Sequence, residues 1–360
     1  MKRALYLKYL LIVITTISVN SQTKSYAQNL ESNVDSLLQE KYPTNTTGAT
    51  FLISKNGNII YEKAFGLANL ELNVPMNTES VFEIGSMTKQ FTAISILMLV
   101  ENDKLNLDDE ITKFIPDYPT NGYKITIHHL LTHTSGIKNY TSLKKLNAIS
   151  KQDLTPLELI DFFKNEPIDF VPGDKFKYNN SGYVILGYII EKVTGQSYAN
   201  FVEEHIFKKL NMTASQYASN SKVIQNRASG YQDNEGYINT REISFTLTYS
   251  AGSLMSNLSD MFKWQEAIKS NLLISKKTTE KAFTNYTLNN GEHINYGYGW
   301  KIKTISNIRS FEHGGAIWGF KSMGVYLPDL DIYVVGLTNC LCNSPTKVTR
   351  EIAKLTAELY

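Results

Sequence analysis

The residues with the clearest potential for chemistry are Ser86 and Lys89, in the segment Ser86-Met87-Thr88-Lys89. Side chains three positions apart share one face of a helix, with Cβ atoms roughly 5–6 Å apart, so the Lys89 amine can reach the Ser86 hydroxyl. A neutral amine can take the serine proton and so activate the oxygen for attack on a carbonyl. The pair therefore predicts acyl transfer, and a helix cap beside an exposed lysine is the alternative interpretation.

The surroundings of Ser86 separate it from the other Ser-x-x-Lys matches in the chain. Gly85 precedes it, and the stretch 91–100 that follows is apolar almost throughout, as in a buried helix. A serine at the start of such a helix lies near free backbone N–H groups and the positive end of the helix dipole. The other matches lie in polar sequence or in sequence that resembles a signal peptide, and they begin at Ser21, Ser142, Ser219 and Ser344.

A second segment with suitable groups is the turn-rich stretch 172–182, which leads into an apolar helix and contains Tyr178 and Asn180. Loops held by rigid elements are where catalytic groups concentrate. Each residue also has a structural interpretation, because Tyr178 is one of 22 tyrosines and Asn180 could cap the helix that begins near Ser181.

A third segment, 313–316, places His313 and two glycines before an expected pair of strands. Glycine lets a backbone approach a ligand closely, although a lone histidine is often a satisfied core residue. The stretch 130–137 has the form of a helix end running into a turn, and a loop that shapes a cleft is the preferred interpretation of its residues 133–136. Trp318 and Phe320 are equally consistent with a substrate pocket and with the core.

The elements expected to position these residues begin with a helix containing Leu30 to Leu38 and a hairpin of strands 49–54 and 59–65, joined at Asn56-Gly57. The region of roughly 100–260 reads as mainly helical. Strand patterns return near the C-terminus, and a final helix follows them. The expected strands are 297–303, 324–327 and 332–337, and the expected final helix contains 348–359.

Strands at both ends of the chain, with helices between them, predict an α/β protein of the α+β type. Its antiparallel β-sheet would be built from the N- and C-terminal segments, flanked by helices, with an inserted helical subdomain at roughly 100–260. We expect a single domain over residues 28–360, with the site between the sheet and the insertion.

The order of these motifs resembles that of serine hydrolases related to class C β-lactamases and D-alanyl-D-alanine carboxypeptidases, the penicillin-binding-protein fold. The resemblance covers nearly the whole chain after residue 27. It rests on Ser-x-x-Lys at 86–89, Leu-Leu-Thr-His-Thr-Ser-Gly at 130–136, Pro-Gly-x-x-Phe-x-Tyr-x-Asn-x-Gly-Tyr at 172–183, His-Gly-Gly at 313–315, and the segments 250–254 and 296–300.

The resemblance implies roles for individual residues. Ser86 would be the nucleophile, Lys89 its general base or proton shuttle, and Tyr178 the group that passes a proton to the leaving atom. The residues implied to bind substrate are Asn180, His313, Gly314, Gly315 and Ala316. Asn180 would also orient Lys89, and the backbone N–H groups of Ser86 and Ala316 would form the oxyanion hole.

This chemistry requires a particular environment around Lys89 and Tyr178, the two side chains that would carry protons. Lys89 can act as a base only if burial and nearby positive charge lower its pKa well below about 10.4, and Tyr178 would lie in the same field. Two fixed N–H donors to the developing oxyanion contribute roughly 3–4 kcal/mol each. Histidine at 313, where many class C β-lactamases have lysine, attracts a carboxylate weakly when neutral, so any β-lactam hydrolysis is expected to be slow.

The N-terminus predicts export. Lys2, Arg3 and Lys8 precede an apolar stretch of ten residues, 10–19, and small residues follow at 25–27, so residues 1–27 read as a signal peptide and the protein as secreted or periplasmic. Ten residues are too few to span a bilayer, so no stable membrane insertion is expected after its removal. The remaining chain has 32 basic and 34 acidic residues, a balance that gives no reason to expect nucleic acid as a partner.

Cys340 and Cys342 are the only cysteines. At a spacing of two on an expected strand end they would point to opposite faces, so two free thiols are favoured over a disulfide. The chain offers few histidine and cysteine ligands, six and two, so no metal is predicted, and the chemistry requires no cofactor.

Together these features predict a secreted serine hydrolase that works through an acyl-enzyme on Ser86. Its substrate would be a small molecule or peptide with an amide, peptide or ester bond: a D-amino-acid peptide, a β-lactam or a small ester. The alternative is a penicillin-binding or sensing module that is acylated but does not turn over. The sequence carries no indication of oligomeric state.

Overall fold

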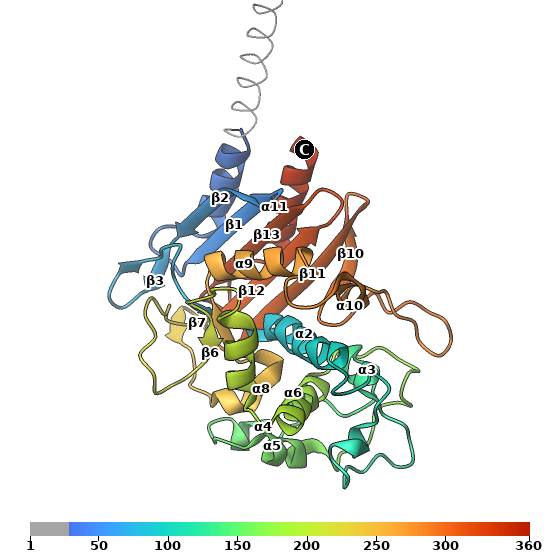
Figure 1. The fold of residues 1–360 in the computed structure, drawn as a ribbon. Coiled ribbons are helices and arrows are strands. Elements are labelled where there is room, and N and C mark those ends of the chain that lie inside the picture. The colour runs from blue at the N-terminus through green and yellow to red at the C-terminus, as the bar shows by residue number, and fades with distance from the viewer. Residues whose placement is uncertain (1–28) are drawn as a thin grey trace, which may run out of the picture.

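The computed structural model describes residues 29–360, and its centre is a six-stranded antiparallel sheet (Figure 1). The N-terminal strand β1 pairs with β13 from the C-terminal end, so both ends of the chain build one sheet and the predicted fold class is confirmed. The signal peptide predicted at 1–27 lies outside the described residues. In spatial order the strands are β10 (Lys301–Ile305), β11 (Ile308–Ile317), β12 (Phe320–Leu327), β13 (Ile332–Thr338), β1 (Ala49–Lys55) and β2 (Asn58–Phe65).

The hairpin of β1 and β2 follows the sequence prediction. Asn56 and Gly57 form its two-residue turn with positive φ values of 51° and 72°, the conformation that Asn-Gly adopts most readily. The turn thereby sets the register in which β1 pairs with β2.

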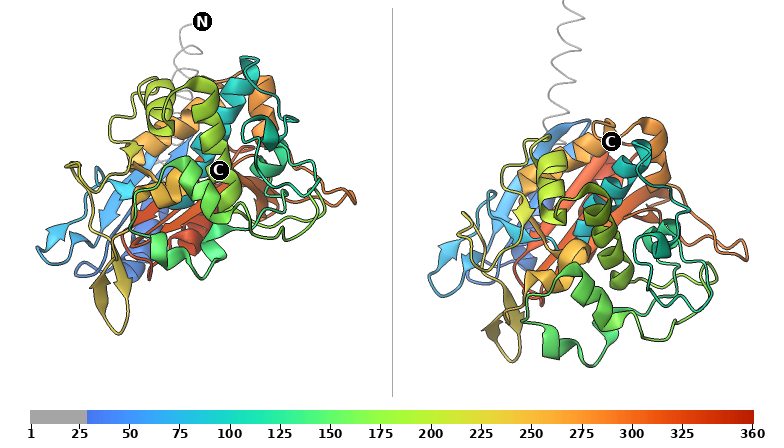
Figure 2. Two further views of the ribbon diagram at one scale, coloured as in Figure 1. Left: turned by 90° about the horizontal axis from the view of Figure 1, so that it is seen from below. Right: turned by 60° about the horizontal axis from the view of Figure 1, so that its bottom comes forward.

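Helices cover both faces of the sheet (Figures 1 and 2). The N-terminal helix, residues 29–41, and α11 (Thr346–Leu359) pack on one face, and α2 (Thr88–Glu101) and α9 (Leu258–Lys269) lie on the other. Alternate side chains of β1 point to opposite faces, and Phe51 packs with the terminal helices while Leu52 packs with the core around α2 and α9. Because both faces are covered, nearly all of β1 is buried.

A helical region lies beside the sheet, and α6 (Asn180–Thr194) is its central element, in contact with α2, α3, α5 and α8. Gly195, at φ 72°, ends α6 as its sequence predicts. Figure 2 shows these helices grouped at one end of the sheet. The other helices are α3 (Ile127–Leu131), α4 (Leu146–Ile149), α5 (Pro156–Phe163), α7 (Tyr198–Val202), α8 (Phe245–Gly252) and α10 (Lys276–Ala282).

Short strands form small ladders away from the main sheet. They pair as β3 (Leu67–Asn69) with β4 (Val74–Pro75), β5 (Phe82–Glu83) and β6 (Gln216–Tyr217) on either side of β9 (Leu254–Ser256), and β7 (Tyr231–Asp233) with β8 (Tyr237–Asn239). The ladder of β5 and β9 places the segment before Ser86 next to the segment that follows α8.

The strands near the C-terminus differ from the prediction in two places. The segment 313–316 precedes the paired strands β12 and β13, as expected, but it also lies inside a further strand, β11, that was not predicted. Its polar and glycine residues weaken the strand pattern, and pairing with β12 holds them in extended conformation. Strand β10 begins at Lys301 and not at residue 297, because Gly299, at φ 87°, interrupts the extended backbone.

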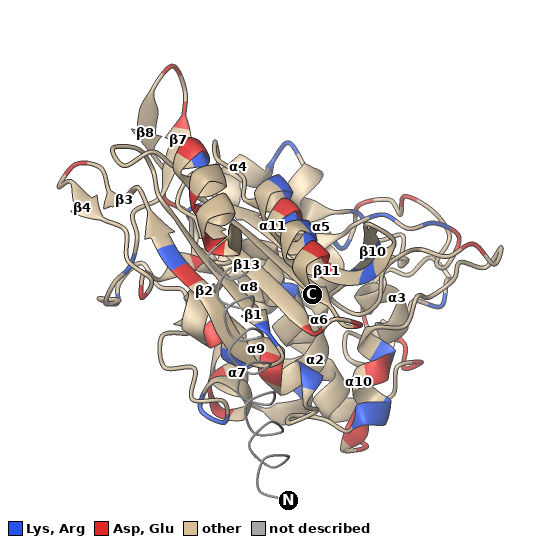
Figure 3. Cartoon of the chain, turned by 90° about the horizontal axis from the view of Figure 1, so that it is seen from above, with Lys and Arg blue, Asp and Glu red and all other residues tan. Residues whose placement is uncertain are grey.

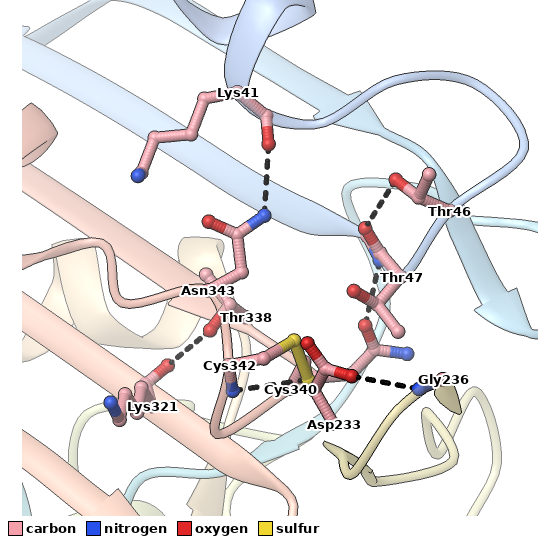
Figure 4. The surroundings of a disulfide bond; sticks show 12 residues. Lys41, Thr46, Thr47, Asp233, Gly236, Lys321, Thr338, Cys340, Cys342 and Asn343 are labelled. Carbon is pink, nitrogen blue, oxygen red and sulfur yellow. Dashed lines mark hydrogen bonds between the residues drawn. A yellow bond between two sulfur atoms is a disulfide. The ribbon is translucent and has the colours of Figure 1, made fainter. Parts of the chain in front are cut away.

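The prediction of two free thiols is wrong, because Cys340 and Cys342 form a disulfide (Figure 4). Strand β13 ends at Thr338 and the chain turns at 341–342, so the alternation of side chains that holds along a strand no longer applies. The two Cα atoms are 5.1 Å apart, within the range of a disulfide.

Charges of both signs are mixed over the surface, as along α11 in Figure 3. Within residues 29–360, no helix combines the length and apolar character that crossing a bilayer would need.

Candidate active site

Ser86 lies in η1 (Gly85–Met87), a single 3₁₀ turn that leads directly into α2. Gly85 has a φ of 52°, and a Cβ atom there would come within 2.9 Å of the Ala316 backbone nitrogen. Only glycine allows η1 and β11 to approach this closely. The turn therefore places Ser86 beside the backbone N–H of Ala316, the second donor predicted for the oxyanion hole.

Lys89 is fully buried in the first turn of α2, and its amine meets three oxygen atoms. The Nζ atom lies 3.2 Å from Ser86 Oγ, 2.7 Å from Asn180 Oδ1 and 2.8 Å from the carbonyl oxygen of Ala251. Burial lowers the pKa of Lys89 well below its ordinary value, and the positive charge of Lys301 lowers it further.

The three partners of Lys89 suit a neutral amine. An uncharged lysine has two N–H bonds and one lone pair. The Asn180 and Ala251 oxygens can only accept, so they take the two N–H bonds and leave the lone pair directed at the Ser86 hydroxyl. An amine held in this way can take the proton of the Ser86 hydroxyl.

Tyr178 packs over the amine, with its ring centroid 4.9 Å from Lys89 Nζ. The Tyr178 hydroxyl is buried and makes no hydrogen bond of standard geometry. It lies near the Ser86 side chain. Burial raises the pKa of Tyr178, and the Ser86 hydroxyl offsets part of that rise. Tyr178 is therefore a protonated O–H at neutral pH.

Asn180 is the first residue of α6, and its side chain connects two segments. Its Oδ1 accepts from Lys89, and its Nδ2 donates to Thr141 Oγ1 at 3.1 Å. The helix cap is Asn179, whose Oδ1 accepts from the Gly182 N–H at 2.9 Å. The cap interpretation therefore applies to Asn179, which leaves the Asn180 side chain free for the site.

His313 is buried and neutral. Its Nδ1 donates to the carbonyl oxygen of Gly314 at 2.8 Å, so its Nε2 accepts from the Tyr296 hydroxyl at 3.1 Å. Burial and the charges of Lys89 and Lys301 lower the pKa of His313 to about 3. His313 therefore brings no positive charge to the site near pH 7.

His133 packs against two of the aromatic side chains at the site. Its ring packs 4.4 Å from the Tyr178 ring and 4.8 Å from the Tyr296 ring, measured between centroids. Its Nδ1 accepts from the Asn179 N–H at 3.1 Å, which ties this loop to the start of α6. The structural interpretation of the stretch 133–136 agrees with this position.

Ser86 lies between two cavities of different character. The first, which we call the apolar cavity, has a volume of about 300 Å³. It is lined by Gly85, Ser86, Tyr140, Thr141, Asn180, Thr248, Ala251, Gly252, Ala316, Ile317, Trp318 and Leu341. Trp318 thus belongs to the cavity, whereas Phe320 is buried and packs edge-on against Phe82.

The second cavity, which we call the lysine cavity, has a volume of about 290 Å³ and extends along β10 and β11. Its walls include Ser86, Tyr178, the segment 312–316 and three lysines, and none of the three lysines forms an ion pair with any residue of the described chain. Its one acidic residue, Glu312, is buried and already paired with Arg350. The three lysines are Lys301, Lys303 and Lys321.

Sequence reasoning assigned no role to four contributors: Tyr296, Lys301, Leu341 and the carbonyl group of Ala251. Tyr296 and Ala251 lie in the noted segments 296–300 and 250–254, whereas Lys301 and Leu341 were not noted. Lys301 follows directly after the noted segment 296–300, and its two-residue spacing from Lys303 puts both on one face of β10. That spacing was a usable indication. The Ala251 contribution is a backbone carbonyl, so the pattern of segment 250–254 gave no indication of its contact with Lys89.

No group of three or more His, Cys, Asp or Glu side chains suited to a metal ion occurs in the part of the chain that the structure describes. The groups that converge on Ser86 are an amine, a phenol, an amide and backbone N–H groups, a set suited to proton transfer and acyl chemistry.

Comparison with known proteins agrees with this geometry. Residues 34–358 match the Beta-lactamase family. A penicillin-binding protein of Bacillus subtilis (strain 168) is 31% identical over 328 residues, which cover 87% of this chain and 72% of that protein. The octameric penicillin-binding protein homologue from Pyrococcus abyssi superposes with a TM-score of 0.80 at 30% identity, covering 91% of this chain and 77% of that one.

A more distant neighbour shows the same fold. The D-amino acid amidase from Ochrobactrum anthropi SV3 superposes with a TM-score of 0.80 at 23% identity and covers 92% of this chain and 98% of its own. With the Ser86 and Lys89 geometry and the match over residues 34–358, these comparisons show that the chain belongs to the Beta-lactamase family of serine hydrolases.

Proposed function

We propose that this protein is an exported serine hydrolase that cleaves amide, peptide or ester bonds through an acyl-enzyme on Ser86. The observation that carries the proposal is the set of contacts of the Lys89 amine, which lies 3.2 Å from Ser86 Oγ while two acceptors hold its N–H bonds. Such a lysine can accept the serine proton at neutral pH, because burial favours its uncharged form.

The reaction follows from these positions. The Ser86 oxygen attacks the substrate carbonyl as its proton moves to Lys89, and the backbone N–H groups of Ser86 and Ala316 stabilise the oxyanion. The leaving group departs with a proton supplied through Tyr178, which burial keeps protonated. Lys89 returns its proton to the Tyr178 oxygen. A water molecule then attacks the acyl ester and releases the acid, which restores the Ser86 hydroxyl.

The two cavities support a substrate with two different ends. The apolar cavity suits the acyl side chain, and the three unpaired lysines of the lysine cavity suit an anionic group on the leaving side. A peptide that ends in a carboxylate meets both requirements, and relatives named penicillin-binding proteins and D-amino acid amidase favour D-amino-acid peptides within this class. Neutral His313 supports the expectation that β-lactams are slow substrates.

Two features support export. The leader pattern at 1–27 predicts removal of the signal peptide, and the Cys340–Cys342 disulfide suits an oxidising compartment such as the periplasm or the cell exterior. We propose a small-molecule or peptide partner and no nucleic acid.

The decisive experiment compares the wild type with Ser86→Ala on acid-ended D-amino-acid peptides, penicillins and short esters. Turnover should fall by about 10⁴-fold or more in the variant, because the nucleophile is gone. Equal turnover in the two proteins would refute the proposal. Mass spectrometry over time tests the alternative function: an adduct that forms on Ser86 and decays indicates an enzyme, and an adduct that persists indicates a sensing module.

A further inference from the structure

The loop after β13 forms part of the apolar cavity, and the disulfide closes around the residue that does so. Leu341 lines this cavity together with Ser86 and Trp318, and it is the residue between Cys340 and Cys342. Cys340 is fully buried, whereas Cys342 is exposed. The disulfide is therefore placed to fix the direction of the Leu341 side chain.

Hydrogen bonds anchor the loop on both sides of this turn (Figure 4). Before it, Asn339 accepts from the Tyr231 N–H at 2.9 Å through its backbone oxygen. After it, Asn343 Nδ2 donates to the Lys41 carbonyl oxygen at 2.8 Å. Between these anchors, the Leu341 N–H donates to the Tyr231 carbonyl oxygen at 3.0 Å, and the Cys342 N–H donates to Cys340 Sγ at 3.1 Å. The disulfide and these local bonds set the backbone at Leu341.

The size of the disulfide loop indicates that its effect is local. Cross-links stabilise a fold mainly by restricting the unfolded chain, and the effect grows with the length of the closed loop. Cys340 and Cys342 are separated by two positions, so their bond restricts little of the unfolded chain. Its main consequence is the shape of the turn that presents Leu341 to the cavity.

We propose that Leu341 is a specificity-determining residue for the acyl group and that the Cys340–Cys342 disulfide positions it. Reduction of the disulfide releases Leu341 from the wall and weakens the preference for apolar acyl groups. The inference rests on the proposed function, because the acyl subsite has a meaning only if Ser86 is acylated.

Reduction by a dithiol is a balanced exchange. The reagent's thiolate attacks the exposed Cys342 sulfur, the S–S bond breaks, and the Cys340 sulfur leaves as a thiolate that takes a proton. The second thiol of the reagent then closes its own disulfide and releases the Cys342 thiol. The protein gains two electrons and two protons, and the dithiol loses the same number.

The test measures kcat/KM of the full chain for 4-nitrophenyl acetate and 4-nitrophenyl hexanoate. In Leu341→Ala, the hexanoate-to-acetate ratio should fall by roughly three- to tenfold, because the longer chain loses an apolar wall. Dithiol-treated wild type and Cys342→Ala should show a fall in the same direction. Leu272→Ala is the matched control, because Leu272 is 68% exposed and does not line the cavity.

Two results would overturn the inference: an unchanged ratio in Leu341→Ala, or a ratio in reduced wild type equal to that of the oxidised protein. Reduction should have no further effect in Leu341→Ala, which separates the role of this side chain from a general loosening of the fold. Absence of turnover in the wild type would count against the proposed function alone. In that case, binding of hexanamide and acetamide is compared between oxidised and reduced Ser86→Ala protein. An equal preference for hexanamide in the two forms contradicts the inference.

Discussion

Lys89 and Lys301 approach the same tyrosine ring, with their amines 4.9 Å and 5.9 Å from the centroid of Tyr178, yet their surroundings give them different chemistry. Lys89 is fully buried and held by three oxygens, whereas Lys301 is partly exposed and lines an open cavity. Burial lowers the pKa of both amines, most strongly for Lys89. The comparison teaches that burial can suit one residue type to two tasks: the proton acceptor that we propose for Lys89 and the anion binding that we propose for Lys301.

The largest effect is expected from removing the buried amine. Lys89→Met should lower kcat/KM by about 10³-fold for every substrate, because a general base contributes on the order of 10²–10⁴-fold. Steady-state assays on a neutral ester and an acid-ended peptide measure it. Lys104→Met, at an exposed position that lines neither cavity, should retain wild-type rates. An intact rate in Lys89→Met would show that another group takes the Ser86 proton.

Removing the partly exposed amine should affect one class of substrate. Lys301→Met is expected to raise KM by about five- to twentyfold for peptides with a carboxylate on the leaving side, because one cationic partner is lost. The same peptides with an amidated end should bind as they do to the wild type. The difference should shrink at high salt, since partly exposed charges are screened. Equal losses for both peptides would assign Lys301 a structural role.

The two lysines are also coupled through their charges. The positive charge of Lys301 lowers the pKa of Lys89, so Lys301→Met should raise that pKa. The base is active when unprotonated, and the acidic limb of kcat/KM against pH should therefore move to higher pH in the variant. A neutral ester is the suitable substrate, because it does not depend on the lysine cavity. A limb that stays in place or moves to lower pH would contradict the coupling.

The smallest effect on catalysis is expected next to His313. Tyr296→Phe removes the hydroxyl that donates to His313 Nε2, and an unpaired buried acceptor costs about 1–3 kcal/mol of folding free energy. Denaturant unfolding measures this loss. KM for acid-ended peptides should stay near the wild-type value, because neutral His313 supplies no charge. A large increase in KM would show that His313 shares the task assigned to Lys301.

The sequence predicted the parts of this molecule that depend on local rules. Asn56-Gly57 specified its hairpin, Gly195 ended α6, and the spacing of Ser86 and Lys89 indicated their contact. Strand β11 was missed because its glycines and polar residues gain their pairing from β12, a tertiary effect.

The disulfide was missed for a related reason. The rule applied to Cys340 and Cys342 assumes that the strand continues, and the chain turns instead. The lysine cavity joins Lys301 and Lys321, which lie on strands separated by β11, so only the folded sheet brings their charges together.

The placement of β1 has a consequence for how the chain is made. Ala49 pairs with Thr338, so the sheet can close only after synthesis has passed residue 338. Until then one edge of the N-terminal hairpin has no neighbouring strand. Strand β13 fills that gap, and the segment that follows β13 places Leu341 in the wall of the apolar cavity. Completion of the sheet and completion of the cavity are thus late events of the same biosynthesis.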